Sequence, residues 1–296
     1  MALDSERIQK NVQKLRKILK KAPKRPTPGE IHELRTRIRR FETTVEALAL
    51  SSKRNERALL RRLKRIRKRA GKIRDMDVLT WHLSSAQVAK EQDCVVQLLE
   101  YLGARRYKEV GRLKQIIRKD GSTARWRLKR TSGRLAELVG ENNKELSDQQ
   151  APARAEATAA ALQHSEELMT PEILNRGNLH PYRLKVKQLR DVLRMAANDA
   201  DEKFVNKLGE VKDSIGEWHD WEELIAIAAK VLDHAPRCSL LRKLKSISNE
   251  NFERALSLTN SMRKDYLRSA GRRTLRSKRH RGPTAPVLKA SSAIAA

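Results

Sequence analysis

The chain has 296 residues, of which 39% are hydrophobic and 34% are charged, so it can bury the core of one large domain or of two bundles of about 150 residues each. Lys and Arg outnumber Asp and Glu by 65 to 36, which gives a formal net charge of +29. Because self-repulsion on this scale opposes a compact state, we expect a partner rich in phosphate groups. Only 4% of the residues are aromatic, which argues against a protein that stacks the bases of a single strand on aromatic rings.

The composition argues against several other classes of protein. Cys94 and Cys238 lie far apart and have no Cys or His at metal-ligand spacing, so we expect buried, reduced side chains and no disulfide framework. No apolar run approaches the ~20 residues of a membrane span, and the first residues lack the apolar centre of a secretion signal. We therefore expect a cytoplasmic protein that does not bind membranes and that is a monomer or a weak oligomer.

Apolar residues recur at helical spacing along most of the chain, and β-branched runs with a period of two are absent. The first three helices are predicted from the apolar sets Ile8, Val12, Leu15 and Leu19; Leu34, Ile38, Phe41, Val45 and Leu48; and Leu59, Leu63, Ile66, Ala70 and Ile73. The fold class is therefore predicted to be all-α.

Turn signals divide the chain into about ten helices joined by short connections. One helix start is sharply defined, because Thr27, Pro28 and Glu30 match a capping box. Breaks are predicted at 51–55, 119–123, 147–153, 175–178 and 234–237. The resulting division is a first helical half at 1–147, a linker with a connecting helix at 148–177, a second helical half at 178–281, and a disordered tail at 282–296.

Two blocks of sequence occur twice in the same order. "IHELRTRIRRF" from position 31 aligns with "LHPYRLKVKQL" from position 179, and "GKIRDMDVL" from position 71 aligns with "GEWHDWEEL" from position 216. The aligned pairs include His32 and His180, Arg35 and Arg183, Arg39 and Lys187, Gly71 and Gly216, and Asp75 and Asp220. The simplest account is a duplicated helical unit whose halves pack with pseudo-twofold symmetry.

Each copy carries a cationic stripe beside its apolar face. At ~100° per residue, the apolar residues of 31–48 fall on one side of a helix and must meet the core. The stripes are formed by His32, Arg35 and Arg39 in the first copy and by His180, Arg183, Lys187 and Arg190 in the second. A face that only needs solvation would not repeat both the histidine and the order of the cations, so we predict that the stripes bind phosphate oxygens.

The segment 61–74 holds nine basic residues among fourteen and no acid. On a neighbouring helix it could form a second wall of the same binding site. Cations from this segment and one from the second half therefore join the candidate site, namely Arg65, Arg69, Lys72, Arg74 and Lys212.

Recognised catalytic motifs are missing from the sequence, which has no Walker loop, dinucleotide-binding glycine motif, zinc motif or nucleophile elbow. We expect Asp75 and Asp220 to orient neighbouring Arg or Lys side chains by ion pairing. His219 has no Ser or Cys motif beside it and is interpreted as a histidine of the helical bundle. We therefore predict a binding protein with no metal or cofactor, and not an enzyme.

The repeated blocks resemble the CHAD domain, a histidine-bearing α-helical domain. The resemblance is carried by "HELRTRIRRF", "IRDMDVL", "HPYRLKVKQLR" and "GEWHDWEEL", which together span about residues 28–225. It implies two four-helix bundles related by pseudo-twofold symmetry around a basic central channel that binds inorganic polyphosphate, often at polyphosphate granules. Carried onto this sequence, it implies a channel lined by His32, Arg35, Arg39, Arg40, His180, Arg183, Lys187 and Arg190.

Two other functions stay open at this point. A nonspecific nucleic-acid-binding protein would use the basic clusters 61–74 and 263–281, the second of which has nine basic residues and one acid. A phosphohydrolase would use Asp75 or Asp220 and would need a metal. Polyphosphate has no bases, and it therefore fits the low aromatic content better than nucleic acid does.

Overall fold

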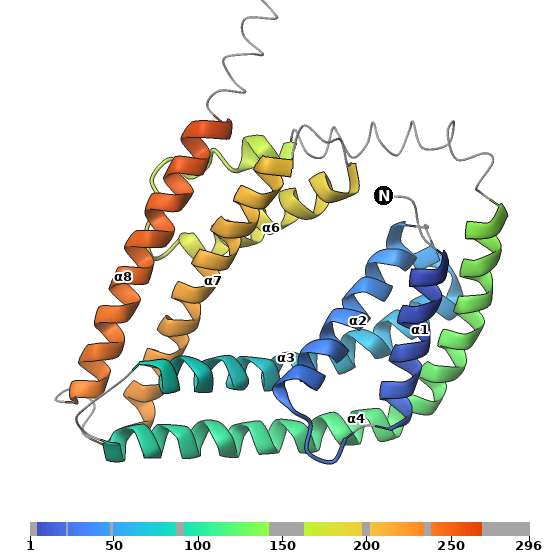
Figure 1. Cartoon of the computed structure of the whole chain (residues 1–296), viewed down its shortest axis with the longest axis horizontal. Coiled ribbons are helices and arrows are strands. Elements are labelled where there is room, and N and C mark those ends of the chain that lie inside the picture. The colour runs from blue at the N-terminus through green and yellow to red at the C-terminus, as the bar shows by residue number, and fades with distance from the viewer. Residues whose placement is uncertain are drawn as a thin grey trace, which may run out of the picture.

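The computed structural model describes residues 5–21, 23–47, 50–86, 92–141, 163–196, 202–233 and 238–267. These residues form helices joined by short connections, and none of them lies in a strand, so the all-α prediction is confirmed. Figure 1 shows two groups of helices at opposite ends of the molecule, connected along the bottom of the view by the long helices α3 (Arg54–Ser85) and α4 (Gln92–Glu141).

The first group is a four-helix bundle. It consists of α1 (Ser5–Lys20), α2 (Pro28–Ala47), the first half of α3 and the second half of α4, with the short helix η1 (Leu50–Ser52) between α2 and α3. One hydrophobic core joins the four helices through side chains such as Leu15, Phe41, Leu63 and Leu128. The predicted apolar faces therefore meet one another, and the break predicted at 51–55 coincides with η1 and the start of α3.

The helix α2 begins at the predicted capping box. The backbone N–H of Thr27 donates to Glu30 Oε2 at 2.7 Å, and the backbone N–H of Glu30 donates to Thr27 Oγ1 at 3.2 Å. These reciprocal bonds satisfy two backbone groups that have no partner inside a helix. They fix the start of the helix that carries His32 and Arg35.

The predicted break at 119–123 is wrong, because α4 continues through it as a helix of 50 residues. Figure 1 shows that α4 bends, so that it lies first along the bottom of the molecule and then beside α1. A Cβ on Gly121 would lie 3.3 Å from the backbone oxygen of Leu19 in α1. Gly121 therefore permits a close contact between two helices and does not form a turn.

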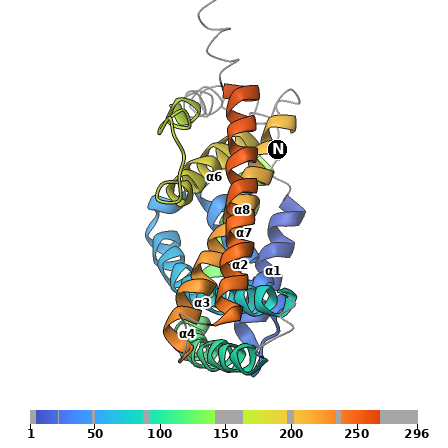
Figure 2. The same ribbon diagram turned by 90° about the vertical axis from the view of Figure 1, so that its left-hand side faces the viewer.

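The second group contains three long helices. They are α6 (Leu179–Ala196), α7 (Glu202–Val231) and α8 (Ser239–Met262), and the π-helical turn η4 (Arg263–Leu267) follows α8. Figure 2 views the molecule from this end, with α8 nearest the viewer. Leu168, Val186, Ile215 and Ala255 belong to the shared core of this group and are fully buried. The break predicted at 175–178 is confirmed, because α6 begins at its end.

A third core joins the two groups. It combines the second half of α3, the first half of α4, the end of α7 and the start of α8. Cys94 and Cys238 meet here with their sulfur atoms 3.7 Å apart, and both side chains are buried, as predicted. The prediction of two four-helix bundles is therefore not confirmed in its detail, because the described residues form a four-helix core, a joining core, and a core of three helices with the segment 163–174.

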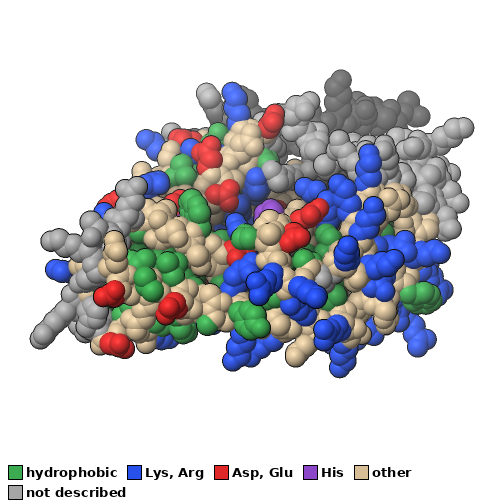
Figure 3. All heavy atoms as spheres, turned by 60° about the horizontal axis from the view of Figure 1, so that its bottom comes forward, with side chains coloured by type: hydrophobic (Ala, Val, Ile, Leu, Met, Phe, Trp, Pro, Cys, Tyr) green, Lys and Arg blue, Asp and Glu red, His purple; other side chains and the backbone are tan. Residues whose placement is uncertain are grey.

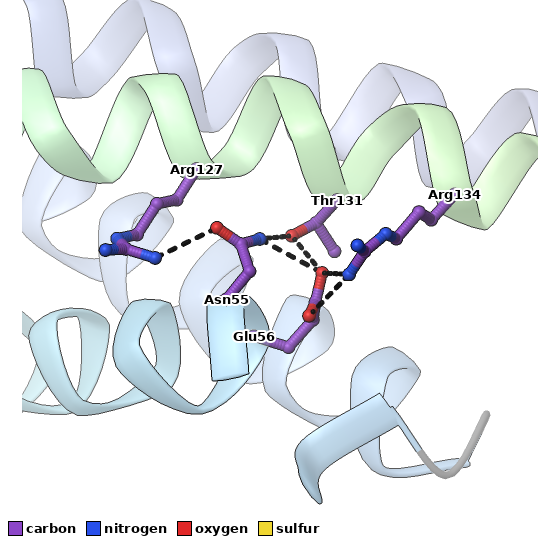
Figure 4. Close-up of polar contacts among 5 residues, drawn as sticks. All are labelled: Asn55, Glu56, Arg127, Thr131 and Arg134. Carbon is purple, nitrogen blue, oxygen red and sulfur yellow. Dashed lines mark hydrogen bonds and ion pairs between the residues drawn. The ribbon is translucent and has the colours of Figure 1, made fainter. Parts of the chain in front are cut away.

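A buried polar cluster fastens the start of α3 to α4 (Figure 4). Glu56 is completely buried and accepts hydrogen bonds from Asn55, Thr131 and Arg134, at 3.0 Å from the first two. Burial raises the pKa of Glu56, but these hydrogen bonds and the positive charge of Arg134 outweigh burial and leave it lowered. The carboxylate is therefore charged and fully paired. Arg127 completes the cluster by donating to Asn55 Oδ1 at 3.0 Å.

Part of the sequence-based division lies outside the described residues. This holds for the tail at 282–296, for most of the basic cluster at 263–281 and for residues 148–162 of the predicted linker. Among the residues that are described, no helix combines the length and the apolar character needed to cross a membrane.

Candidate functional site

The cationic stripe of α2 lies away from the core of the first bundle. His32, Arg39 and Arg40 are exposed, whereas Arg35 is partly buried. His32 Nε2 lies 3.4 Å from Thr36 Oγ1, one turn further along the same face. The helix therefore buries one side and presents cations on another, as its sequence predicts.

Arg35 lies across the neighbouring helix α3 at Gly71. A Cβ on Gly71 would lie 3.0 Å from Arg35 Nη1, so a side chain here would press on the guanidinium group. Arg35 Nη1 also lies 3.8 Å from Asp75 Oδ1, which confirms the ion-pairing role expected for Asp75. Burial lowers the pKa of Arg35, as do Arg39 and other nearby cations, while Asp75 opposes this. In the first copy of the Gly-x-x-x-Asp motif, glycine thus makes room for an arginine and aspartate faces it, whereas Asp220 of the second copy lies 3.9 Å from His82 Nε2.

The second half repeats the contact between arginine and glycine twice. Arg183 lies across Gly216, where a Cβ would lie 2.9 Å from its Nη2, and its Nε donates to the backbone oxygen of Lys212 at 3.0 Å. Arg190 lies across Gly209, where a Cβ would lie 3.0 Å from its Nη2, and its Nε donates to another α7 backbone oxygen at 3.3 Å. Because both bonds use Nε, the terminal nitrogens of each guanidinium are oriented for a further acceptor.

The two stripes meet at Arg39 of α2 and Lys187 of α6, which are equivalent residues of the repeat. Partial burial lowers the pKa of the Lys187 ammonium group, and the positive charges of Arg39 on α2, Arg183 on α6 and Arg67 on α3 lower it further. Solvent screens charges that are separated by more than about 10 Å, so this effect requires the groups to lie close together. The structure therefore brings cations from both halves into one place.

The equivalent aspartates of the repeat also lie near each other, on α3 and α7. Burial raises the pKa of Asp75 to about 6, and the negative charges of Glu223 and Asp220 contribute to this rise, while Arg35 and Arg74 oppose it. Asp75 is consequently half protonated near pH 6. Its negative charge is present at neutral pH and is lost on mild acidification.

His180 and His219 lie ring against ring, with centroids 3.8 Å apart. Burial is the largest cause of a lowered pKa for both imidazoles, and Arg183 lowers both further, while Asp220 opposes the shift. His180 Nδ1 is buried without a hydrogen-bond partner in the described part of the chain. An anion beside these rings would favour their protonated forms and could accept a hydrogen bond from this nitrogen.

We call this assembly the junction site, because it lies where the two halves meet. Its cations and histidines come from four helices: α2, α3, α6 and α7. They are Arg35, Arg39, Arg67, Arg74, His180, Arg183, Lys187, Arg190 and His219.

Some predicted site residues lie elsewhere. Arg65 pairs with Asp120 of α4 at 2.9 Å, and Arg69 pairs with Glu109 of the same helix. At ~100° per residue, both arginines lie on a different face of α3 from Gly71. The run of nine cations in 61–74 is therefore divided between two sides of one helix.

Lys72 and Lys212 have acidic neighbours. Lys72 lines a cavity of about 340 Å³ between α3, α4 and α7, together with Asp75, Glu109 and Glu223. The Lys212 ammonium group pairs with Asp213. The Lys212 backbone oxygen nevertheless belongs to the site, because it holds Arg183.

Two residues of the junction site were not predicted from the sequence. Arg67 lies one turn before Gly71 on the same face of α3 and forms an ion pair with Glu42 at 2.7 Å. The sequence places His219 in the helical bundle without a role in binding, and in the structure its ring lies against that of His180. The repeat carries a signal for both, because Arg67 aligns with Lys212 and His219 aligns with Arg74.

Within the described ranges, no group of three or more His, Cys, Asp or Glu side chains is arranged to hold a metal ion. Three carboxylates near the site, Asp75, Asp220 and Glu223, lie among arginines and histidines. The chemistry that the junction site offers is therefore the binding of an anion by guanidinium, ammonium and imidazole groups.

The fold and the junction site define an all-α protein with a duplicated helical unit and paired cationic helices. The chain belongs to the CHAD domain family, whose model matches residues 6–229. The CHAD domain from the plant Ricinus communis has a similar structure, with a TM-score of 0.53, 16% sequence identity and 88% of each chain covered. At this identity the likeness shows the fold alone. A comparison with curated proteins found no match.

Proposed function

We propose that this protein binds inorganic polyphosphate at the junction site. The observation that carries the proposal is the meeting of equivalent cations from the two halves, Arg39 and Lys187, beside Arg35 and Arg183. Without a ligand, these groups are partly desolvated and also repel one another, which lowers the pKa of Lys187 and of Arg35. A polyanion would neutralise this repulsion, and the relief of repulsion would contribute to its free energy of binding.

The shape of the site favours an extended ligand over a single phosphate. Arg183 and Arg190 lie seven residues apart on α6, which corresponds to about 10 Å along a helix. The stripe of α2 continues the row of cations in the other half. A linear chain of phosphates can contact such a row at several points, whereas one phosphate ion reaches only a few of its members.

The nature of the side chains favours a polymer without bases. Two tryptophans of α7 flank His219 in sequence, and Trp218 and Trp221 are buried at 3% and 4% exposure in the cores. Neither can act as an exposed platform for a base. Guanidinium and ammonium groups bind phosphate oxygens without contacts to bases.

We further propose that the protein is a binder and not a phosphohydrolase. Asp75 faces Arg35, and its raised pKa reflects burial beside other carboxylates. This arrangement suits the positioning of an arginine. By the same proposal the protein is cytoplasmic and associates with polyphosphate granules.

Titration of labelled long-chain polyphosphate tests the proposal. We expect submicromolar, strongly salt-dependent binding that Arg35→Ala combined with Arg183→Ala weakens by roughly several hundredfold, because each charged hydrogen-bonding group contributes about 1.5–3 kcal/mol. The control is Arg118→Ala with Lys119→Ala, which removes the same charge from exposed positions of α4. Equal losses in the two variants would show that binding depends on net charge alone and would reject the site.

The alternative is nonspecific binding of nucleic acid through the clusters 61–74 and 263–281. The position of Arg263 does not support nucleic-acid binding. This side chain is buried, so a ligand cannot reach it, and it donates to the backbone oxygens of Leu168, Met169, Pro171 and Glu172. Competition separates the two proposals. Duplex DNA at an equal phosphate concentration should fail to displace polyphosphate at physiological salt, and displacement would favour the alternative.

A further inference from the structure

A second basic surface covers the exposed side of α4, far along the chain from the junction-site residues of α6 and α7. We call the exposed side chains between residues 107 and 133 the outer face of α4. Its cations are Lys108, Arg112, Arg118, Lys119, Lys129 and Arg130, and all six are exposed. Figure 3, which brings the bottom of the molecule forward, shows Lys and Arg side chains gathered most densely over its right-hand part.

The outer face presents no exposed carboxylate. Residues 107–133 contain two acids, Glu109 and Asp120, which are 9% and 2% exposed. Glu109 pairs with Arg69 and Arg112, and Asp120 pairs with Arg65 and Arg62. Both acids are therefore neutralised by arginines of α3 and α4. The other cations of the outer face are exposed to solvent, so the surface carries an excess of positive charge.

Two aromatic rings stand on the outer face among these cations. Tyr107 is 79% exposed and Trp126 is 56% exposed. The guanidinium carbons of Arg127 and Arg130 lie 5.8 and 5.9 Å from the centroid of the Trp126 ring, which is within cation–π range. In the described residues the exposed aromatic rings all lie on α3 and α4, although the chain has few aromatic residues in total. Rings and cations are thus combined here, whereas the junction site offers cations without exposed rings.

We propose that the outer face of α4 binds single-stranded nucleic acid. Its lysines and arginines would contact phosphates, and Tyr107 and Trp126 would stack on bases. This combination of cations and exposed rings is the one by which proteins hold single strands without reading their sequence. The proposal goes beyond polyphosphate binding and does not depend on it, because the two surfaces share no residue.

Other polyanionic partners fit this surface less well. Polyphosphate has no bases, so it gives the rings no role. A duplex keeps its bases stacked and out of reach of Tyr107 and Trp126. A lipid surface requires apolar side chains that can insert, but the apolar side of α4 is buried in two cores and the outer face has no exposed aliphatic side chain.

The test compares a labelled oligothymidine with an abasic strand of equal length. Tyr107→Ala with Trp126→Ala should weaken oligothymidine binding about tenfold or more, because stacking on a ring contributes ~1–3 kcal/mol per base. The same variant should bind the abasic strand and long-chain polyphosphate as the wild type does. Trp81→Ala, which removes an exposed ring from α3, is the matched control and should leave oligothymidine binding unchanged.

A second variant tests the phosphate contacts on the same surface. Gly111→Glu places a carboxylate on the outer face, where a Cβ meets no atom within 4 Å, so the fold is preserved. It should weaken both strands, whereas Arg35→Ala with Arg183→Ala should weaken neither. Equal loss of oligothymidine and abasic strand in the ring variant would overturn the proposal. Absence of strand binding, a preference for duplex DNA, or loss of strand binding in the Arg35 and Arg183 variant would also overturn it.

Discussion

The two halves of the duplicated unit hold their arginines in different ways. In the second half, Arg183 and Arg190 each lie across a glycine of α7 and donate to a backbone oxygen of that helix. In the first half, Arg35 lies across Gly71 but faces the carboxylate of Asp75. A backbone oxygen does not titrate, whereas a carboxylate does. The contacts that hold these two arginines of the second half are therefore independent of pH, whereas the first half couples its arginine to a group that changes charge near pH 6.

The difference extends one heptad along the helices. Arg190 aligns with Glu42, which forms an ion pair with Arg67 at 2.7 Å. Burial raises the pKa of Glu42, and Arg67 lowers it. The first half thus offers fewer uncompensated cations than the second. We expect the second half to supply more of the affinity for polyphosphate and the first half to supply more of its pH dependence.

The largest expected effect comes from removing one arginine at a time. Arg183→Ala should weaken polyphosphate binding by about fifty-fold and Arg35→Ala by about fifteenfold, both within the ~1.5–3 kcal/mol of a charged hydrogen bond. Arg183 should matter more because the Lys212 backbone oxygen holds it in place, whereas Asp75 competes with the ligand for Arg35. Titration of labelled polyphosphate at pH 7.5 measures both losses. A larger loss for Arg35→Ala would reverse the comparison.

The next largest effect comes from the glycines, and its sign differs between binding and stability. Gly216→Ala should weaken polyphosphate binding several-fold, because the new methyl group would displace the Arg183 guanidinium. The same change should leave the free energy of unfolding unchanged or raise it by up to about 1 kcal/mol, since alanine is the better helix former. Gly71→Ala should have the same effects but smaller ones, because fewer Arg35 atoms lie near its Cβ position.

Gly103→Ala is the control for the glycine series. A Cβ at this exposed position in α4 meets no atom within 4 Å. We expect a similar gain in stability by thermal unfolding and no change in polyphosphate binding. Weaker binding in this variant, or unchanged binding in Gly216→Ala, would show that the glycines do not act by making room for arginine.

A smaller effect concerns pH and Asp75. As the pH falls from 7.5 to 5.5, Asp75 becomes protonated through its pKa of about 6, and polyphosphate affinity should rise because a negative charge leaves the site. Asp75→Asn should bind about threefold more tightly at pH 7.5, as expected for one screened charge, and should lose much of the pH dependence. The raised pKa means that the charged carboxylate destabilises the fold above pH 6, so Asp75→Asn should also raise the melting temperature at pH 7.5 more than at pH 5, by a small amount because solvent screens a carboxylate that is 54% exposed. An unchanged pH profile of binding would exclude Asp75 as the main source of the pH dependence.

The smallest effect is expected for cations that point away from the junction site. Arg65→Gln with Arg69→Gln removes two charges, but both side chains pair with acids of α4. Polyphosphate affinity should fall by less than about threefold, which is the range of a screened surface charge. A loss as large as that of Arg183→Ala would mean that the ligand contacts both faces of α3.

Much of the fold follows from local signals in the sequence. Apolar spacing predicts the helical cores, and Thr27 with Glu30 predicts the start of α2. The break at 119–123 was predicted wrongly because glycine in a sequence does not reveal whether it bends the backbone or admits a neighbour. Gly121 admits α1, a contact that only the tertiary structure creates.

The site was predictable where the repeat pairs residues and less so elsewhere. The alignment of Arg35 with Arg183 and of Gly71 with Gly216 identifies contacts that the structure contains in both halves. In 61–74, by contrast, charge density alone does not tell which side of α3 meets the other half, so Arg65 and Arg69 were chosen and Arg67 was missed. A cationic face can be assigned only when the position of the neighbouring acids, here Asp120 and Glu109 of α4, is known.

The central claim is that both halves bind one chain of polyphosphate together. Titration calorimetry with chains of defined length tests it most directly, because it measures how many chains each protein molecule binds. We predict one long chain per molecule, with the stoichiometry unchanged and the affinity reduced in both Arg35→Ala and Arg183→Ala. Two chains per molecule, one lost with each single variant, would show that the halves are independent sites and would contradict the account.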